Sequence, residues 1–451
     1  MSEEHVKKVA FYTLGCKMNT YDTQWYGEQF AQQGYQEVPF GEPADVTVVN
    51  TCTVTGQGDA QSRNALRRAH RTSPEGTVVA VGCYAQTDPD TLSEMPEVDL
   101  VVGNAEKTQL MDLLNDTCSM GRTFVTRSRA TDFEDMDIYN FGGRSRAFVK
   151  VQEGCNEFCS FCIIPFARGR SRSRTVDSTV AQVQKLVDAG YGEVVLTGVH
   201  IGDYGVDLDG TQLLDILEAI EQVDGLLRFR VSSIEATFVT DAMIDFFETS
   251  EKFCRHLHVP LQSGDDGVLK AMRRPYMRAQ YIELIEKLAS RIPDIGIGGD
   301  VMVGFPGESD AAFQNTYDLI ASHPMTYLHV FPYSPRGKTP AARMPDQVDA
   351  QVKKQRGATL RALGAEKVAA FQDRFIGQTL PVLFESRRRD GLLSGLTDNY
   401  IRVIAPGADV ACDKVLDVQL DRIQEGVVLG NIVADGFQQT EKHTLDLLQV
   451  E

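Results

Sequence analysis

The stretch EGCNEFCSFCIIP at residues 153–165 decides how the rest of the chain is interpreted. It places Cys155, Cys159 and Cys162 in a C-x3-C-x2-C spacing on one short loop, directly after an apolar run. Three thiolates on one loop can hold three irons of a cubane cluster and leave the fourth iron open for a small molecule. A structural zinc site takes four protein ligands, and an ordinary ferredoxin cluster takes four cysteines. The alternative is a zinc loop that a distant side chain such as His200 completes.

A series of βα units surrounds this loop and predicts the fold. The candidate strands are residues 147–152, 193–198, 228–233, 256–261, 297–304 and 327–333. The candidate helices are residues 178–189, 211–223, 239–250, 266–290, 309–322 and, at the end of the series, 346–371. Six βα units are fewer than the eight of a closed barrel. We therefore expect residues 146–371 to form an open, partial (βα)6 barrel.

Upstream of the barrel, residues 1–120 alternate Val-rich runs with helical stretches. The runs are VAFYTLG (9–15), DVTVVNT (45–51) and TVVAVG (77–82), and the helical stretches include residues 20–33 and 56–71. Short apolar runs of this kind suit strands that are buried on both faces of a parallel sheet. We therefore expect an α/β fold here, a doubly wound domain around a parallel sheet.

Three further cysteines follow these runs one by one. Cys16, Cys52 and Cys83 each come at the end of one run, about one βαβ unit apart. The carboxyl ends of all strands in a parallel sheet lie at one edge, where ligands bind, so the three cysteines can converge there. This pattern predicts a second three-thiolate site, again with one open iron. The alternative is three unrelated buried thiols, because free cysteine is often buried.

Two other regions differ in residue composition and pattern from both of these domains. Residues 121–145 are polar, carry the charge cluster DFEDMD and are expected to form a linker. In residues 372–451, short alternating runs such as QTLPVLFE and NYIRVI are punctuated by Gly, Asp and Asn. This pattern predicts a small β-barrel of five strands, similar to an OB-fold. The isolated Cys118, Cys254 and Cys412 are expected to act as small hydrophobic residues.

The composition of the 451-residue chain limits its partners. Its 45 Lys and Arg face 63 Asp and Glu, which gives a formal net charge of −18 and excludes a protein that coats nucleic acid through its overall charge. An RNA ligand would need a local basic patch. Such a patch is offered by four alternating arginines, which in an extended segment would point the same way beside the cysteine loop: Arg168, Arg170, Arg172 and Arg174. The alternative is a solvated strand edge.

The sequence carries no sign of a membrane or of an oxidising compartment. The N-terminus MSEEHVKKVAFY lacks the apolar core of a signal peptide, and no apolar run approaches the ~18 residues of a transmembrane span. Nine cysteines, an odd number, argue against a disulfide framework. We expect a cytoplasmic protein that does not contact a membrane.

The cysteine loop after the first strand of a βα barrel resembles the radical S-adenosylmethionine superfamily. With the N-terminal three-cysteine domain and the small β-barrel, the chain is similar to the methylthiotransferases over about residues 7–437. The matching segments are TLGCKMNTYDT, NTCTVT, GCYAQ, EGCNEFCSFCIIPFARG, HVPLQSGDDGVLKAMRR, VGFPGES and FPYSPRGKTPA. The last unit resembles the TRAM domain, an RNA-binding module, and its RNA role rests on this resemblance because its own net charge is negative.

The resemblance implies two [4Fe-4S] clusters with distinct tasks. The first would bind S-adenosylmethionine through its open iron, and cleavage of that cofactor would yield a 5′-deoxyadenosyl radical. The second would hold the sulfur that another S-adenosylmethionine methylates. The catalytic cysteines of the first and second clusters would be, respectively, Cys155, Cys159 and Cys162, and Cys16, Cys52 and Cys83.

The same resemblance assigns two residues to the cofactor. Phe161, just before the third cysteine of the loop, matches the family's aromatic position near the adenine. Gly198 belongs to VVLTGVHIGDYG (194–205), which resembles the family's glycine-containing segment near the methionine amino group. For Gly198, the alternative is an ordinary turn after a strand.

Methylthiotransferases insert sulfur and a methyl group at an unactivated C–H bond, and the resemblance implies tRNA, S-adenosylmethionine, an unidentified electron donor and an unidentified sulfur source as partners. Two segments, TLGCKMN and ARGRSRSR, resemble those of the branch that acts on N6-threonylcarbamoyladenosine 3′ of the anticodon. In the first segment, Lys17 after the cysteine looks like that branch, whereas Met18 is closer to the isopentenyladenosine branch. The carboxylate of the threonylcarbamoyl group could pair with an Arg fork. The alternatives are the isopentenyladenosine substrate, an aspartate of a ribosomal protein, and a non-enzymatic iron–sulfur protein that binds RNA.

Overall fold

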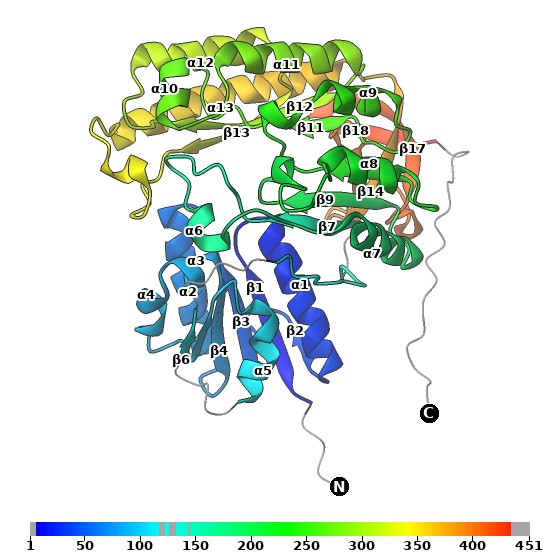
Figure 1. Ribbon diagram of the computed structural model, residues 1–451. Coiled ribbons are helices and arrows are strands. Elements are labelled where there is room, and N and C mark those ends of the chain that lie inside the picture. Colours follow the sequence, from blue (N-terminus) through cyan, green and yellow to red (C-terminus); the bar gives the residue numbers. More distant parts are fainter. Residues whose placement is uncertain (1–5, 117–121, 126–131, 143–144, 434–451) are drawn as a thin grey trace.

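The computed structural model of the chain describes residues 6–116, 122–125, 132–142 and 145–433. Figure 1 shows three units in chain order: an α/β domain in blue, a larger α/β unit in green and yellow above it, and a small β-barrel in orange and red against the larger unit. Within the described ranges, none of the helices combines the length and the apolar character that a membrane crossing needs.

The first domain is a six-stranded parallel sheet with the strand order β2-β1-β3-β4-β5-β6. Its strands are β1 (Lys8–Thr13), β2 (Gln36–Val38), β3 (Val46–Thr51), β4 (Thr77–Gly82), β5 (Leu100–Val102) and β6 (Arg122–Phe124). Its helices are α1 (Lys17–Gln32), α2 (Gly56–Thr72), α3 (Cys83–Thr87), α4 (Pro89–Ser93) and α5 (Leu110–Asn115). All six residues of β3 are buried, as expected for a central strand with a helical layer on each face. The predicted parallel α/β fold is confirmed.

The second unit contains the six predicted parallel strands of a partial barrel. They are β7 (Arg146–Glu153), β9 (Glu193–Gly198), β10 (Arg228–Val231), β11 (His256–His258), β12 (Gly296–Val303) and β13 (Tyr327–Pro332). The strands form two sheets, β10-β9-β7 and β11-β12-β13, which an isolated parallel bridge joins between β10 and the residues before β11. A two-residue strand, β8 (Arg172–Ser173), pairs antiparallel with the end of β7.

Helices cover the outside of this partial barrel (Figure 1). They are α7 (Val176–Asp188), α8 (Leu213–Glu221), α9 (Asp241–Thr249), α10 (Asp266–Ala271), α11 (Arg278–Arg291), α12 (Asp310–Ser322) and α13 (Ala350–Asp373). The short helix α6 (Ile164–Arg168) instead lies at the junction with the first domain, against α3. The prediction of a single helix over residues 266–290 is wrong, because α10 and α11 are two separate helices. Pro275 lies between them and disfavours the helical conformation at the residue before it, and Arg273 has a positive φ of 59°.

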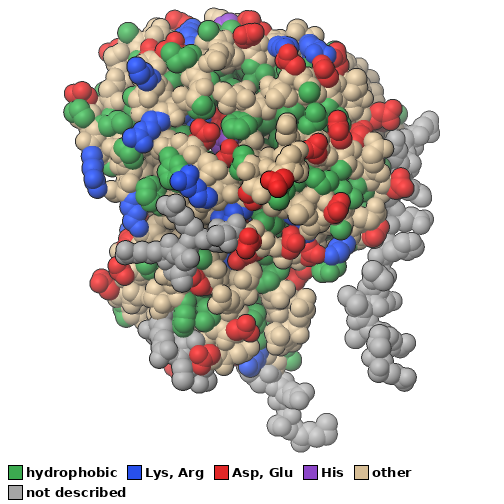
Figure 2. All heavy atoms as spheres, viewed as in Figure 1, with side chains coloured by type: hydrophobic (Ala, Val, Ile, Leu, Met, Phe, Trp, Pro, Cys, Tyr) green, Lys and Arg blue, Asp and Glu red, His purple; other side chains and the backbone are tan. Residues whose placement is uncertain are grey.

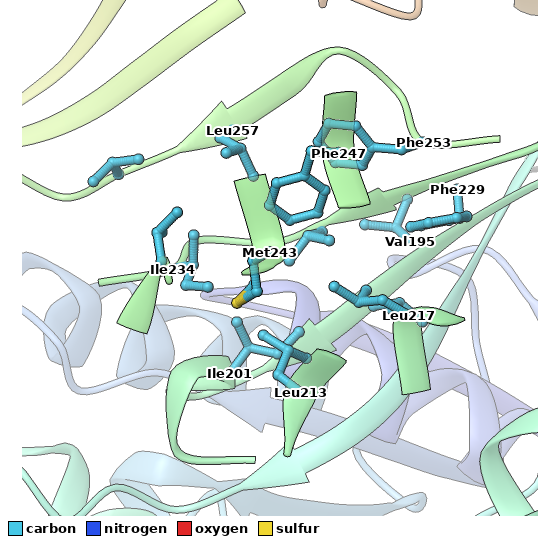
Figure 3. Packing of buried hydrophobic residues seen from close by; sticks show 14 of the residues in the cluster. Val195, Ile201, Leu213, Leu217, Phe229, Ile234, Met243, Phe247, Phe253 and Leu257 are labelled. Carbon is cyan, nitrogen blue, oxygen red and sulfur yellow. The ribbon is translucent and has the colours of Figure 1, made fainter. Parts of the chain in front are cut away.

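The core of the barrel unit lies between the strands and these helices. Figure 3 shows Val195 of β9, Phe229 of β10, Leu217 of α8 and Phe247 of α9 in one apolar cluster. The ring of Phe247 stacks on that of Phe253 with centroids 4.2 Å apart. Each of these side chains is buried, so the apolar stripe of each helix faces the sheet.

The third unit is a closed five-stranded barrel with the order β14-β15-β16-β18-β17, as predicted. Its strands are β14 (Thr379–Arg387), β15 (Leu393–Thr397), β16 (Arg402–Ala405), β17 (Val415–Gln424) and β18 (Val427–Ile432). The turn between β15 and β16 lies against the amino ends of the (βα)6 strands. Arg230 of β10 donates to the carbonyl oxygens of Thr397 and Asp398 at 2.6 and 2.7 Å, and the Tyr400 ring stacks on His256 of β11 at 4.1 Å. The small barrel therefore closes that end of the larger one.

The predicted linker at 121–145 is described over residues 122–125, 132–142 and 145, and these residues take part in the fold of both neighbouring domains. Residues 122–124 form the edge strand β6, and Met136, Ile138 and Phe141 are fully buried in the core of the barrel unit. Acidic residues from DFEDMD pair with buried cations of that unit, such as Asp137 with Arg174. The charge cluster therefore serves as a set of counter-ions.

Buried charges join the first domain to the barrel. Asp22 of α1 and Glu153 of β7 are the central carboxylates of this charge network. Lys107 lies 2.7 Å from Glu153, Lys150 lies 3.2 Å from Asp22, and Arg168 contacts both acids at 2.6 and 3.1 Å. All five side chains are at most 3% exposed. Since buried charges are tolerated only when each has its counter-ions, these contacts hold the two domains in one arrangement.

We expect Asp22→Asn to destabilise the protein strongly. It removes a negative charge that faces Lys107, Lys150 and Arg168, so the free energy of unfolding should fall by about 3–5 kcal/mol. Denaturant unfolding followed by circular dichroism measures this loss. The matched control is Asp241→Asn, which forms an exposed ion pair with Lys287 and should lower the free energy of unfolding far less, because water screens that pair. Equal effects of the two substitutions would contradict the role given to the network.

Candidate active site

The loop with Cys155, Cys159 and Cys162 begins at the carboxyl end of β7, and its backbone is tightly seated. Gly154 has a φ of +81°, and a Cβ atom there would lie 1.8 Å from the carbonyl oxygen of Arg170, so only glycine fits. The amide of Cys155 donates to the Gly169 carbonyl at 3.1 Å, which joins the loop to the residue after α6. The amide of Cys162 donates to the Cys159 carbonyl, also at 3.1 Å.

Hydrogen-bond donors point at the sulfur atoms of this loop. The amide of Glu157 donates to Cys155 Sγ at 3.5 Å, and the guanidinium of Arg274 donates to Cys159 Sγ at 3.0 Å. Arg274 is itself held by an ion pair with Glu235. Burial raises the pKa of Cys155 and that of Cys162 to about 12. Thiols this buried ionise only beside a cation, so the donor set fits an iron–sulfur cluster, in which metal ions and these donors stabilise the thiolates.

Gly198 is connected to the cysteine loop by the side chain of Gln152. A Cβ atom at Gly198 would be 2.9 Å from Gln152 Oε1, and that amide donates from Nε2 to the carbonyl of Gly154 at 2.8 Å and to Ser171 Oγ at 2.7 Å. The same Oε1 accepts from the amide of His200 at 2.8 Å. Gly198 therefore allows β9 to approach the residue that braces the start of the cysteine loop.

A cavity of about 120 Å³ lies between the two domains next to Cys162. One wall is Phe161 and Cys162 from the cysteine loop, and another is Val54 and Thr55, which follow Cys52. The wall from the barrel strands and the loops after them includes Gln262, Met302 and Tyr333. Gln262 Oε1 and the Tyr333 hydroxyl are buried without a hydrogen-bond partner among the described residues. The aromatic walls and the two unpartnered polar atoms offer stacking and hydrogen bonds to an adenine ring such as that of S-adenosylmethionine.

The second cysteine set is brought together at the carboxyl edge of the first sheet. Cys16 follows β1 and is the N-cap residue of α1, Cys52 follows β3, and Cys83 begins α3 directly after β4. A Cβ atom at Gly15, which has a φ of +101°, would lie 3.0 Å from Cys52 Sγ. Burial raises the pKa of Cys52 to about 11, and the neighbouring thiols of Cys83 and Cys16 add to the rise.

Asn19 of α1 joins this set to the cysteine loop of the barrel. Its amide donates to the carbonyl oxygens of Leu14 at 2.6 Å and Thr51 at 3.0 Å, which fixes the loops before Cys16 and Cys52. Its Oδ1 accepts from Arg168 at 2.6 Å, and Arg168 ends α6, the helix that follows Cys162. Burial raises the pKa of Cys83, and the Arg168 guanidinium opposes that rise. Arg168 therefore lies between the two cysteine sets.

The predicted stripe of four parallel arginines is wrong. Arg168 ends a helix and Gly169 has a φ of +76°, so the segment is not extended. Arg168, Arg172 and Arg174 are at most 6% exposed, and they face Glu153 or Asp137. Arg170 is exposed, with its guanidinium over the Phe158 ring at 4.7 Å. Three of the four arginines turn inward because Glu153 and Asp137 neutralise them. The alternation of the arginines along the sequence gave no sign of these acidic partners.

The sequence analysis did not identify several residues that lie in or near the site. Arg274 and Asn19 lie in the quoted segments HVPLQSGDDGVLKAMRR and TLGCKMNTYDT, but nothing in their spacing points to a sulfur atom. His258, Asp300 and His329, from β11, β12 and β13, bring three ligand atoms within 4.8 Å of one another. The other ring nitrogen of His258 lies 3.0 Å from the Tyr327 hydroxyl. These residues lie on adjacent strands at positions whose side chains point to the same face of the sheet. That register is the signal from which the sequence could have predicted the cluster.

Comparisons with known families and relatives follow the division into three units. Residues 8–103 match the Uncharacterized protein family UPF0004, residues 149–320 match the Radical SAM superfamily, and residues 373–433 match the TRAM domain. The threonylcarbamoyladenosine tRNA methylthiotransferase MtaB of Bacillus subtilis (strain 168) is 41% identical over 91% of this chain and 93% of its own. The enzyme of that name from Aquifex aeolicus (strain VF5) is 39% identical over 89% and 97%.

A second group of relatives is less similar. The tRNA-2-methylthio-N(6)-dimethylallyladenosine synthase of Moorella thermoacetica is 33% identical over 93% of this chain and 97% of its own. Among solved structures, the radical S-adenosylmethionine methyltransferase TsrM from Kitasatospora setae superposes with a TM-score of 0.55 at 15% identity, covering 74% of this chain and 77% of that one. At that identity the likeness concerns the fold alone.

We expect Arg170→Gln to weaken RNA binding, because Arg170 is the exposed member of the arginine run. The loss of one phosphate contact should lower the slope of log affinity against log salt by about 0.7–0.9. Filter binding of a tRNA at several salt concentrations measures the slope. The matched control is Arg291→Gln on α11, where the arginine pairs with Asp245 and Glu248 and should leave the slope unchanged. An unchanged slope for Arg170→Gln would remove Arg170 from the interface.

Proposed function

The chain belongs to the threonylcarbamoyladenosine tRNA methylthiotransferase family, and we propose that it converts N6-threonylcarbamoyladenosine, 3′ of the anticodon, to its 2-methylthio derivative by radical S-adenosylmethionine chemistry. The observation that carries the proposal is the meeting of the two cysteine sets. The cavity beside Cys162 is walled on its other side by Val54 and Thr55, the residues after Cys52. A radical formed at one set can therefore act on a substrate that the other set also reaches.

The chemistry explains why the site needs metal clusters rather than a general base. The C2–H bond of adenine is neither acidic nor nucleophilic, and a carbon radical is required to abstract its hydrogen. We propose two [4Fe-4S] clusters, which when bound supply an electron for cleavage of S-adenosylmethionine and a place for the sulfur that is transferred. The electron donor and the sulfur source are further partners that the chain itself does not identify.

The residues of the chain hold and orient the reactants in this scheme. Phe161 and Met302 offer an apolar surface to the adenine of the cofactor, and Gln262 and Tyr333 offer it hydrogen bonds. Arg274 places positive charge at Cys159 and so stabilises its thiolate. Arg168, at the end of α6, holds Asn19 and thereby the loops before Cys16 and Cys52 in position. A fixed separation of the two sets keeps the radical close to its target.

The tRNA would approach the side where the two α/β domains meet. On the face in Figure 2, Lys and Arg side chains gather at the left, beside α6 and the residues between β13 and α13, while Asp and Glu side chains are more frequent at the right. Exposed cations of this region include Arg170, Lys338 and Arg343. A local basic surface of this kind lets a chain of net charge −18 bind RNA.

The relatives favour the threonylcarbamoyl substrate over the isopentenyl one. The relatives named for threonylcarbamoyladenosine reach 41% identity, whereas the dimethylallyladenosine synthase of Moorella thermoacetica is 33% identical. Mass spectrometry of tRNA nucleosides from cells that lack the protein tests this choice. Loss of 2-methylthio-N6-threonylcarbamoyladenosine supports the proposal, and loss of the methylthio isopentenyl nucleoside alone would overturn it.

Substitution of one cysteine from each set should separate the two half-reactions. Cys159→Ala should abolish 5′-deoxyadenosine formation, because its set supplies the radical. Cys52→Ala should keep that cleavage largely intact and give no methylthio product. Each variant should also bind about half the iron of the wild type after anaerobic reconstitution. Chromatography of the products and iron analysis provide the measurements.

The matched control is Cys412→Ala, which lies in the small β-barrel away from both sets and should change neither product. If Cys52→Ala loses both reactions while it stays folded and keeps half its iron, the division of labour between the sets is wrong.

A further inference from the structure

Three side chains that can ligate a metal ion converge on the inner face of the partial barrel. His258 lies on β11, Asp300 on β12 and His329 on β13, three strands that lie side by side (Figure 1). His258 Nε2 lies 3.0 Å from Asp300 Oδ1, and His329 Nδ1 lies 3.3 Å from the same oxygen atom. The two imidazole rings stack with centroids 5.0 Å apart. In this His–Asp–His cluster, two ring nitrogens and one carboxylate oxygen therefore meet within 4.8 Å of one another.

The register of the sheet places the His–Asp–His cluster inside the barrel, deeper than the cavity next to the cysteine loop. Asp300 pairs with His329 across β12 and β13, and two residues further along the same strands Met302 pairs with Phe331. Side chains two positions apart on a strand point to the same face, and both Met302 and Phe331 line that cavity. The cluster therefore faces the same interior, roughly 7 Å along the strands from the cavity wall.

Asp300 lacks the permanent positive charge that other inward-facing carboxylates have. Asp22, Glu153 and Glu193 are each paired with Lys or Arg side chains. Among the described residues, the ion-pair partners of Asp300 are the two histidines, whose rings are charged only when they are protonated. With neutral rings the cluster carries one negative charge. A bound divalent cation would supply the missing counter-charge.

One histidine of the cluster is held from behind, and the other side of the cluster is open. His258 Nδ1 lies 3.0 Å from the Tyr327 hydroxyl, which also lies 2.8 Å from His256 Nε2. A contact of this kind fixes the orientation of a metal-ligating histidine and leaves its other nitrogen for the metal. The His329 side chain is 62% exposed and that of Asp300 is 28% exposed. Three protein ligands with accessible space beside them match metal sites that keep a coordination position open.

We propose that His258, Asp300 and His329 bind one divalent transition-metal ion of the zinc class on the inner wall of the barrel. Two imidazoles and one carboxylate suit this class, whereas Mg²⁺ and Ca²⁺ prefer oxygen ligands. The separations of 3.0 and 3.3 Å are close to the roughly 3.4 Å between ligand atoms in a tetrahedral site with bonds of about 2.0–2.1 Å. The open position takes an oxygen or nitrogen atom of a ligand inside the barrel. The site is separate from both cysteine sets and does not depend on the proposed function.

The test counts zinc on the holoprotein, in which both cysteine sets are first loaded with iron and sulfide under anaerobic conditions. The protein is dialysed to equilibrium against a series of buffered zinc chloride concentrations, and the bound zinc per chain is measured. His329→Ala removes an exposed ligand, and Tyr327→Phe removes only the contact behind His258. The matched control is His323→Ala, a histidine at the end of α12 that contacts Glu286 outside the barrel.

We expect the wild type and His323→Ala to bind one zinc ion per chain more than His329→Ala at the same free zinc concentration. Tyr327→Phe should keep the site and weaken its affinity about 10- to 100-fold. The zinc X-ray absorption spectra of the wild type and His329→Ala are then compared. Their difference should show nitrogen and oxygen ligands at about 2.0–2.2 Å and no sulfur at about 2.3 Å.

Equal zinc content of the wild type and His329→Ala would overturn the proposal and leave the three residues as a hydrogen-bonded set. Sulfur ligands in the difference spectrum would overturn it as well. If the cysteines take up no iron, zinc on their thiols adds equally to every variant, and the difference due to His329 remains measurable. Failure of the proposed function is therefore distinguishable from failure of this metal site.

Discussion

Asp22 and Glu153 are the two carboxylates on which the arrangement of both cysteine sets depends. Each is buried, and each faces cations that come from both domains: Lys107 from the first, Lys150 and Arg168 from the barrel. In a medium of low dielectric constant, separation of such groups would leave several charges without counter-ions. The two domains are therefore held at one distance, and the single contact of Arg168 with Asn19 extends that constraint to the loops of Cys16 and Cys52.

The sequence predicted the fold well where periodicity and strand ends were the signal. The Val-rich runs predicted the parallel sheet, and the six βα units predicted the partial barrel. The positions of Cys16, Cys52 and Cys83 after strands predicted that they would converge at one edge of the sheet. Those inferences depend only on local pattern and on the geometry of parallel strands, which hold wherever a sheet is buried on both faces.

The errors have a common physical origin in contacts between distant parts of the chain. The arginine run and DFEDMD each looked solvent-exposed alone, but Arg174 and Asp137 neutralise each other, and burial becomes favourable for the pair. No local pattern encodes such partners. The break between α10 and α11 differs, because Pro275 was visible in the sequence and could have been used.

The β15–β16 turn that seats against Arg230, His256 and Gly296 makes the barrel a chamber with one blind end. Reactants can therefore reach the interior only from the carboxyl end or from the open side between the edge strands β8 and β13. A single nucleotide would enter there by swinging out of its stack, with the phosphate backbone left outside. The small barrel thus confines access to the side on which both cysteine sets lie.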